Sequence, residues 1–359
     1  MKVSTAEPDE DQNRESITEF EAYDRKNLNS ELDEIDRMDW RIKIRKIGFL
    51  VFISLLGLLI LYGIILMVVS GSPSDKTDKK PENKPANNTS HKQDFEWVND
   101  ANGNKYQVLG QYSRKSTHYT QGLYLGDGVM VESGGLYGQS TLQFLEVDEQ
   151  GKFINVAKQV NVPSNYFAEG CDVITVDNVK YIYQLTWKEN KIFKYDMNLK
   201  LIKEFDKPIQ LKEGWGITHN PSNQCSLIIS DSSSTLHKVN CLSMEVTESI
   251  PVTKNNNPLY SMNELEFAED YLLANVYLSK DVYIIDLKTG KVVRTLDLSA
   301  LLQRANEERT KRGLYSLGYD ECLNGIAYDW QNKHLWITGK NWPLFFKIKL
   351  PDEYLKSSV

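Results

Sequence analysis

Short apolar runs alternate with polar turns along the chain from about residue 94 onward. Runs rich in Val, Ile, Tyr and Phe are bounded by Gly, Asn, Asp and Ser, as at 181–187, 226–231, 271–278 and 334–339. Such runs are typical of short β-strands. Within this region, only residues 298–311 have the composition of a helix. We therefore expect an all-β region over residues 94–351, followed by a C-terminal tail at 352–359.

A polar triplet recurs through this region: a polar residue, a small or acidic residue, then an apolar one. It begins at Gln121, Glu169, Glu213, Asn263 and Asn324, at steps of 48, 44, 50 and 61 residues. Five units of this size predict a five-bladed β-propeller with four strands in each blade, and residues 105–112 would complete the last blade. The first residue of each triplet would then ring one mouth of the central channel. A β-sandwich is the alternative, but it does not explain the recurring triplets.

One segment differs from all the others. Residues 47–69 carry no charged side chain, and at 1.5 Å per residue a helix of this length would span roughly 34 Å. A buried core helix is the alternative, which the absence of any polar face disfavours. We expect a single transmembrane anchor, followed by a flexible stalk at 70–93 that is rich in Lys, Pro, Asn and Ser.

Residues 1–46 form an acidic segment that ends in a cluster of Arg and Lys next to the anchor. We expect a disordered tail, which the basic cluster places in the cytosol. The catalytic domain would then be lumenal or extracellular, in the secretory pathway. The overlapping sequons at Asn87 and Asn88 agree with glycosylation on that side of the membrane.

The composition excludes several classes of protein. A formal net charge of −7 argues against a nucleic-acid partner. The five histidines are scattered with no H-x-x-x-H pair, and four cysteines are too few for a disulfide scaffold or a pair of zinc ribbons. We therefore expect no metal site. If residues 226–239 form a hairpin, Cys225 and Cys241 lie opposite each other and a disulfide is geometrically feasible. Two free thiols are the alternative.

Aromatic residues accompany the polar triplets. They include Tyr119, Trp187, Trp215, Tyr277, Trp336 and Trp342. Packing between blades explains any one of them, whereas together with the polar groups they predict a small-ligand pocket. The motifs of serine hydrolases, P-loop proteins and dinucleotide-binding proteins are absent from the sequence. Burial beside aromatic side chains would raise the pKa of Glu169 and suit it to proton transfer, and Lys340 could stabilise negative charge.

The motifs in order resemble one family. HYTQGLYL, ESGGLYGQSTL, YFAEGCD, YQLTWKE, EGWGIT, MNELEF, LLANVY, LNGIAYD and ITGKNWP are similar to the plant-type glutaminyl-peptide cyclotransferases, from about Tyr119 to Pro343. This resemblance implies a five-bladed propeller and a reaction in which the N-terminal glutamine of a peptide or protein cyclises to pyroglutamate and releases ammonia. It implies no metal cofactor, and a structural calcium ion in the channel is left open.

The resemblance also implies residue roles. Glu169 would be the general acid and base, with Lys340 and Asn263 as further catalytic residues. The substrate-binding positions would be Gln121, Tyr119, Trp187, Trp215, Glu264, Tyr277 and Asn324. Gln121, Asn263 and Lys340 would donate to the substrate carbonyl or oxyanion, and Glu264 would hold the α-amine or fix Lys340. The family commonly has Phe and Trp where Tyr119 and Tyr277 stand, so a non-catalytic propeller that binds peptide N-termini or a protein partner is the alternative function.

Overall fold

The computed structural model describes residues 97–223 and 225–357. This part of the chain is built of β-strands, with one α-helix and one short 3₁₀ helix, which confirms the all-β prediction. The α-helix, α2, runs from Ser299 to Lys311, within one residue of the helix that the sequence predicts. The 3₁₀ helix, η1, runs from Asp352 to Tyr354.

Most strands belong to antiparallel sheets of four, in which strands that follow each other along the chain lie side by side. The first comprises β3 (Thr120–Gly126), β4 (Val129–Gly134), β5 (Thr141–Val147) and β6 (Phe153–Asn161). The second comprises β7 (Ala168–Val176), β8 (Val179–Thr186), β9 (Lys191–Asp196) and β10 (Leu201–Asp206). The third comprises β11 (Ile217–His219), β12 (Ser226–Ser230), β13 (Thr235–Asn240) and β14 (Val246–Pro251). The fourth comprises β17 (Met262–Ala268), β18 (Tyr271–Val276), β19 (Asp281–Asp286) and β20 (Lys291–Asp297).

The last sheet joins the two ends of this region. It comprises β21 (Leu323–Asp329), β22 (His334–Gly339), β23 (Leu344–Lys349) and β2 (Lys105–Arg114). Strand β2 pairs antiparallel with β23, which confirms that an early strand completes the last sheet. A parallel pairing of Ser113 and Arg114 with Phe153 and Ile154 of β6 then connects the last sheet to the first.

Three short strands lie outside this pattern. Strand β1 (Trp97–Asn99) extends the last sheet by pairing with β2, and the hairpin of β15 (Thr253–Lys254) and β16 (Asn257–Pro258) extends the fourth sheet beside β20. These three strands pair at the outer edges of the sheets and make no pairing with the innermost strands.

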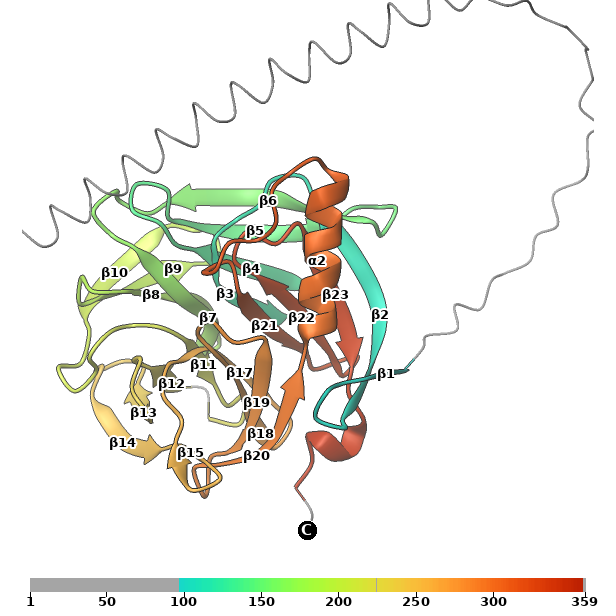
Figure 1. The fold of residues 1–359 in the computed structure, drawn as a ribbon. Coiled ribbons are helices and arrows are strands. Elements are labelled where there is room, and N and C mark those ends of the chain that lie inside the picture. Colours follow the sequence, from blue (N-terminus) through green and yellow to red (C-terminus); the bar gives the residue numbers. More distant parts are fainter. Residues whose placement is uncertain (1–96, 224, 358–359) are drawn as a thin grey trace, which may run out of the picture. The chain divides into compact units, whose positions relative to one another are not determined.

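The sheets are arranged radially. Figure 1 shows the first strand of each sheet near the centre of the molecule and the fourth strand at the periphery. Burial follows this order, because every residue of β17 is buried whereas most residues of the peripheral strand β10 are exposed. Apolar side chains of neighbouring sheets share one core, as where Val131 and Leu142 of the first sheet join Val173 and Ile182 of the second. The arrangement fits a β-propeller.

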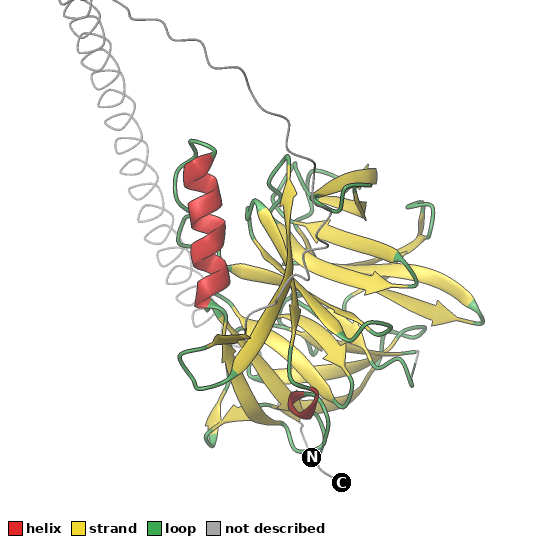
Figure 2. Ribbon diagram, turned by 90° about the vertical axis from the view of Figure 1, so that its right-hand side faces the viewer, coloured by secondary structure: helices red, strands yellow, loops and turns green. Residues whose placement is uncertain are grey.

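Helix α2 stands beside the strands (Figure 2). It buries Leu301 and Ala305 in the apolar cluster shared by the fourth and last sheets. The cluster also takes in Leu355, whose carbonyl accepts a hydrogen bond from the backbone N–H of Asp270 at 3.1 Å. The packed region therefore extends beyond Pro351, into the segment for which the sequence predicts a C-terminal tail.

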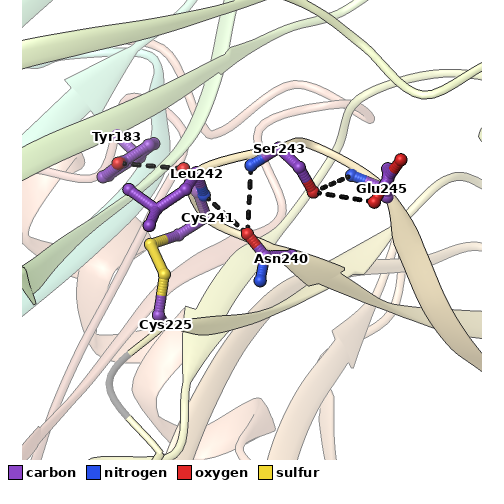
Figure 3. The surroundings of a disulfide bond; sticks show 7 residues. All are labelled: Tyr183, Cys225, Asn240, Cys241, Leu242, Ser243 and Glu245. Carbon is purple, nitrogen blue, oxygen red and sulfur yellow. Dashed lines mark hydrogen bonds between the residues drawn. A yellow bond between two sulfur atoms is a disulfide. The ribbon is translucent and has the colours of Figure 1, made fainter.

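One disulfide joins the start of β12 to the end of β13. Cys225 and Cys241 are bonded with their Cα atoms 5.0 Å apart, because Ser226 pairs with Asn240 in the hairpin between them (Figure 3). The expected hairpin geometry is confirmed, and the bridge is formed in the structure. The hydroxyl of Tyr183, in the second sheet, donates to the carbonyl of Cys241 at 3.1 Å and ties the bridge to the neighbouring sheet (Figure 3).

The predicted cytosolic tail, membrane anchor, stalk and sequons lie outside the described residues. Within residues 97–223 and 225–357, no helix has both the length and the apolar character that crossing a membrane requires.

Candidate active site

The polar triplets coincide with irregularities in the innermost strands. The pairing register shifts between Thr120 and Gly122 in β3, and at the equivalent places in β7, β17 and β21. The shifted positions are Gln121, Glu169–Gly170, Asn263–Glu264 and Asn324–Gly325. A β-bulge redirects a side chain that regular alternation would point elsewhere. In four of the five sheets the recurring triplet therefore coincides with a β-bulge, which turns a polar side chain toward the centre.

Glycines let the innermost strands approach one another closely. A Cβ atom on Gly122 would lie 2.4 Å from the backbone nitrogen of Cys171, and one on Gly170 would lie 2.6 Å from the carbonyl oxygen of Trp215. A Cβ atom on Gly216 would lie 2.0 Å from the carbonyl oxygen of Asn263. Any larger residue at these positions would force the sheets apart and separate the polar groups.

A cavity of about 180 Å³ lies at the end of the inner strands where the triplets stand. Its lining comprises Tyr119, Gln121, Phe167, Glu169, Trp187, Trp215, Asn263, Tyr277 and Lys340. All three predicted catalytic residues and five of the seven predicted substrate-binding residues are therefore brought together. Phe167 is the lining residue that the sequence did not single out as a site residue. The available signal was its position next to Tyr166 and two residues before Glu169.

Glu169 is 5% exposed, and its backbone carbonyl accepts a hydrogen bond from the hydroxyl of Ser133. Burial raises the pKa of its carboxyl well above the ordinary value. The positive charge of Lys340 opposes this shift, while Glu213 and Glu189 add to it. A carboxyl with a raised pKa can accept a proton and return it near neutral pH, which is the property expected of a general acid and base.

A directional chain of amides orients Gln121. The Nδ2 of Asn275 donates to Oδ1 of Asn324 at 3.1 Å, and Nδ2 of Asn324 donates to Oε1 of Gln121 at 2.9 Å. The Nε2 of Gln121 is therefore turned toward Glu169 and donates to its Oε1 at 3.4 Å. Asn324 is fully buried and does not line the cavity, so it supports Gln121 from behind and makes no contact with a ligand there.

Lys340 lies between two aromatic rings. Its ammonium nitrogen is 5.1 Å from the ring centroid of Tyr119 and 4.8 Å from that of Tyr277, and the side chain is 4% exposed. Lys340 forms no ion pair with any residue of the described part of the chain. The two rings attract the ammonium through their faces and leave its donors available to a bound molecule.

The two tryptophans share one acceptor. Nε1 of Trp187 and Nε1 of Trp215 donate to the same oxygen, Oε2 of Glu213, at 3.0 and 2.7 Å. The sequence predicts that Glu213 joins the polar ring at the channel mouth, but it does not line the cavity. Residues 213–216 precede β11 and lack the bulge of the other inner strands, so the Glu213 side chain fixes the aromatic wall.

Glu264 also differs from the prediction. Its Oε1 accepts a hydrogen bond from the backbone N–H of Leu123 at 2.7 Å, and its side chain is absent from the cavity lining. Burial raises the pKa of Glu264 well above the ordinary value, and the amides of Leu123, Ile326 and Gly325 oppose this. The carboxyl therefore lies against inner strands of the first and last sheets, and in this structure it neither lines the cavity nor forms an ion pair with Lys340. Its role in holding the α-amine stays a prediction.

Two buried acceptors of the cavity lining have no donor among the residues that the structure describes. They are Oε2 of Glu169 and Oδ1 of Asn263, which belongs to a side chain 3% exposed. An unpaired polar atom in such a place costs free energy unless a bound molecule satisfies it. The cavity therefore suits a ligand that brings N–H donors to these two oxygens and an oxygen acceptor to Lys340. Within the described residues, no group of three or more His, Cys, Asp or Glu side chains is arranged to hold a metal ion.

Comparisons with known proteins point to one family. The family model described as glutamine cyclotransferase matches residues 83–350. The chain is 32% identical over 258 residues to the glutaminyl-peptide cyclotransferase of Arabidopsis thaliana, an alignment that covers 71% of this chain and 74% of the relative. It is similar to the crystal structure of the Myxococcus xanthus glutaminyl cyclase, with a TM-score of 0.58, 28% identity and coverage of 68% of this chain and 96% of the other. The chain therefore belongs to the glutamine cyclotransferase family.

Proposed function

We propose that this protein is a glutaminyl-peptide cyclotransferase, which converts the N-terminal glutamine of peptides and proteins to pyroglutamate and releases ammonia. Family membership and the named relatives support this reaction. The observation that carries the proposal is the pair of unpartnered acceptors on Glu169 and Asn263, beside Lys340, in a small aromatic cavity. An N-terminal glutamine supplies the complement, because it has an α-amine, a carboxamide NH₂ and a carbonyl oxygen.

The substrate is held by three polar contacts and an aromatic wall. The α-amine donates to Oε2 of Glu169, the carboxamide NH₂ donates to Oδ1 of Asn263, and the carbonyl oxygen accepts from Lys340. Trp187 and Trp215 enclose the methylene groups of the side chain. These contacts bring the amine nitrogen close to the carboxamide carbon of the same residue, so the ring closure becomes an oriented intramolecular reaction.

Ring closure transfers one proton through Glu169. As the amine nitrogen attacks the carboxamide carbon, an N–C bond forms and the carbonyl electron pair moves to the oxygen, while Glu169 accepts a proton from the nitrogen. Glu169 then returns this proton to the departing NH₂ group, the C–N bond breaks and ammonia leaves as the carbonyl reforms. Both nitrogens are attached to one carbon in the intermediate, so a single carboxyl can serve both steps.

Lys340 stabilises the oxyanion of the tetrahedral intermediate. Its ammonium is already fixed between two rings and does not need to reorganise during the reaction. A fixed charge in a partly water-excluded site stabilises developing charge more strongly than the same charge in water. Each chemical task thus has a protein group, and we propose that the reaction needs no metal. A structural calcium ion in the channel stays a separate hypothesis.

The proposal includes the architecture and the cellular setting. The sheets β3–β6, β7–β10, β11–β14, β17–β20 and β21–β23 with β2 would be the five blades of a propeller, supported by one polar triplet in each unit. Residues 47–69 would anchor the protein in a membrane, with residues 1–46 in the cytosol, the catalytic domain in the lumen or outside the cell, and glycans on Asn87 or Asn88. The uncharged run of residues 47–69 and the disulfide of the catalytic domain support this setting.

The reaction is tested with the full-length chain purified in detergent. Ammonia release is measured from a peptide amide that begins with Gln, from the same peptide beginning with Asn, and from both after treatment with EDTA. We expect release from the Gln peptide alone, unchanged by EDTA. Binding of the Gln peptide without ammonia release would contradict the proposal and favour a non-catalytic binding propeller, whereas loss of activity with EDTA would contradict the metal-independent route.

A further inference from the structure

Three carboxylates contact the cavity wall from its outer side. Glu213 accepts hydrogen bonds from both Trp187 and Trp215, as described above. Oδ2 of Asp320 accepts from the hydroxyl of Tyr119 at 3.1 Å, and Oε2 of Glu189 accepts from the backbone N–H of Phe167 at 3.4 Å. We call Glu189, Glu213 and Asp320 the acidic rim. They come from the β8–β9 turn, the segment before β11 and the segment before β21, and therefore surround the cavity from different sides.

The carboxylates of the acidic rim have no ion-pair partner in the described part of the chain, although Lys207 interacts electrostatically with Glu213. Among residues 97–223 and 225–357, one cation besides Lys340 lies over a ring of the wall: Nζ of Lys188 is 3.9 Å from the ring centroid of Trp187. A concave site whose surroundings carry excess negative charge raises the local concentration of cations.

Exposed tyrosine rings accompany two of these carboxylates. Tyr137 is 50% exposed, and its hydroxyl donates to Oε1 of Glu189 at 2.6 Å. Tyr319 is 84% exposed and directly precedes Asp320. A carboxylate next to an exposed aromatic face is a suitable surface for a guanidinium or ammonium group, which gains from both the opposite charge and the ring.

We propose that the acidic rim selects peptides with a basic residue directly after the N-terminal glutamine or one position further. This inference rests on the proposed function, because only the glutamine fits the small cavity and the following residues must leave through its mouth. The α-ammonium group is common to all substrates, so its attraction to the rim does not discriminate among them. The charge of the second and third residues does discriminate, and a Lys or Arg there lies next to the rim.

The test compares three peptide amides, Gln-Lys-Ala, Gln-Ala-Ala and Gln-Glu-Ala, with the full-length protein in detergent. Ammonia release gives kcat/KM for each peptide at roughly 20 mM salt and at about 0.5 M salt, where charges more than a few ångströms apart are screened. The rim variant is Glu189→Gln with Asp320→Asn, which removes two charges and keeps one hydrogen-bond acceptor at each position. The matched control is Glu149→Gln, in the β5–β6 turn at the far end of the first sheet.

At low salt we expect kcat/KM for the Lys peptide to exceed that for the Glu peptide by on the order of tenfold, with the Ala peptide between them. High salt and the rim variant should each reduce this ratio to within about threefold, while the Glu149→Gln control keeps it. Equal values for the three peptides in the wild-type protein, or a ratio that salt leaves unchanged, would overturn the proposal. If no peptide releases ammonia, the proposed function itself fails, which is a different outcome from equal turnover of all three.

Discussion

The guanidinium of Arg114 and the carboxylate of Glu132 form a bidentate pair, at 2.9 and 2.7 Å, with both side chains buried. Arg114 lies in β2 of the last sheet and Glu132 in β4 of the first, so the pair crosses the junction where the ring of sheets closes. Thr120 and Gln143 donate to the same carboxylate, which leaves it fully satisfied. Burial raises the pKa of Glu132, but the interactions with Arg114 and His118 lower it by more. The pKa of Glu132 therefore lies well below the ordinary value.

Replacing Arg114 with Ala should destabilise the fold by about 3–5 kcal/mol, because it leaves a buried carboxylate unpaired. The measurement is urea unfolding, with Lys180→Ala as the control. Lys180 pairs with Asp127 at the exposed end of the neighbouring sheets, and losing that pair should cost about 0.5 kcal/mol. Equal effects of the two substitutions would show that the Arg114–Glu132 pair does not stabilise the junction between the last and first sheets.

The same pair predicts a pH dependence. A carboxyl whose pKa is lower in the folded state contributes stability at pH values above its unfolded pKa, about 4.3 for Glu. The contribution is lost as the pH falls from there through the lowered native value. The difference in unfolding free energy between wild type and a Glu132→Gln variant should therefore shrink below about pH 4.

The sequence predicts three polar residues of the cavity because they come from one repeated local feature. A triplet that recurs once per sheet occupies the same place in each inner strand, so Gln121, Glu169 and Asn263 meet once the sheets are arranged around an axis. The sequence does not predict which neighbour in a triplet faces the cavity, because a bulge adds one residue and changes the direction of the side chain. Asn263 lines the cavity and Glu264 faces other strands for this reason.

Other features depend on contacts that no local pattern contains. Glu213 stands at a triplet position, but its strand begins later and lacks the bulge, so its carboxylate contacts two indoles. The Arg114–Glu132 pair exists only because the first and last sheets meet, which requires the whole ring. The membrane anchor and the sequons stay predictions, since they lie outside the described residues.

The disulfide should contribute to stability. Cys225 and Cys241 are 16 residues apart, and closing a loop of this length in the unfolded chain is worth about 3 kcal/mol in the chain-entropy model. Replacing both with Ser should lower the unfolding free energy by about that amount in urea. Reductant should destabilise the wild-type protein similarly and leave the double variant unchanged, whereas an equal response of both proteins would assign the effect to another group.

Glu213 should act as a positioning residue. Glu213→Ala removes the acceptor of both indole N–H groups, so we expect KM for a Gln peptide to rise by about tenfold with a smaller change in kcat. Glu213→Gln keeps an oxygen acceptor and should restore most of the loss. A similar KM increase in the Glu149→Ala control would mean that the effect is not specific to the tryptophans.

Lys340 should have a double effect. Lys340→Met removes the charge that stabilises the oxyanion and should lower kcat by about 10²–10³-fold. The charge of Lys340 also lowers the pKa of Glu169, so its removal should raise that pKa further. The increase of kcat/KM with pH that reports the ionisation of Glu169 should therefore occur at higher pH. The part of the pH profile that reports the ionisation of the substrate α-amine, near pH 8, should not shift. Lys188→Met is the control, because the charge of Lys188 lies outside the cavity. In this variant neither ionisation in the pH profile should shift.

The most direct test of the account is the turnover of Glu169→Gln, which keeps the size and one hydrogen-bond acceptor of the side chain and removes its proton transfer. With a Gln-initiated peptide amide at saturating concentration, and folding verified by near-ultraviolet circular dichroism, we expect kcat to fall by about 10²–10⁴-fold. Wild-type turnover in this variant would contradict the assignment of Glu169 as the general acid and base, and with it the proposed mechanism.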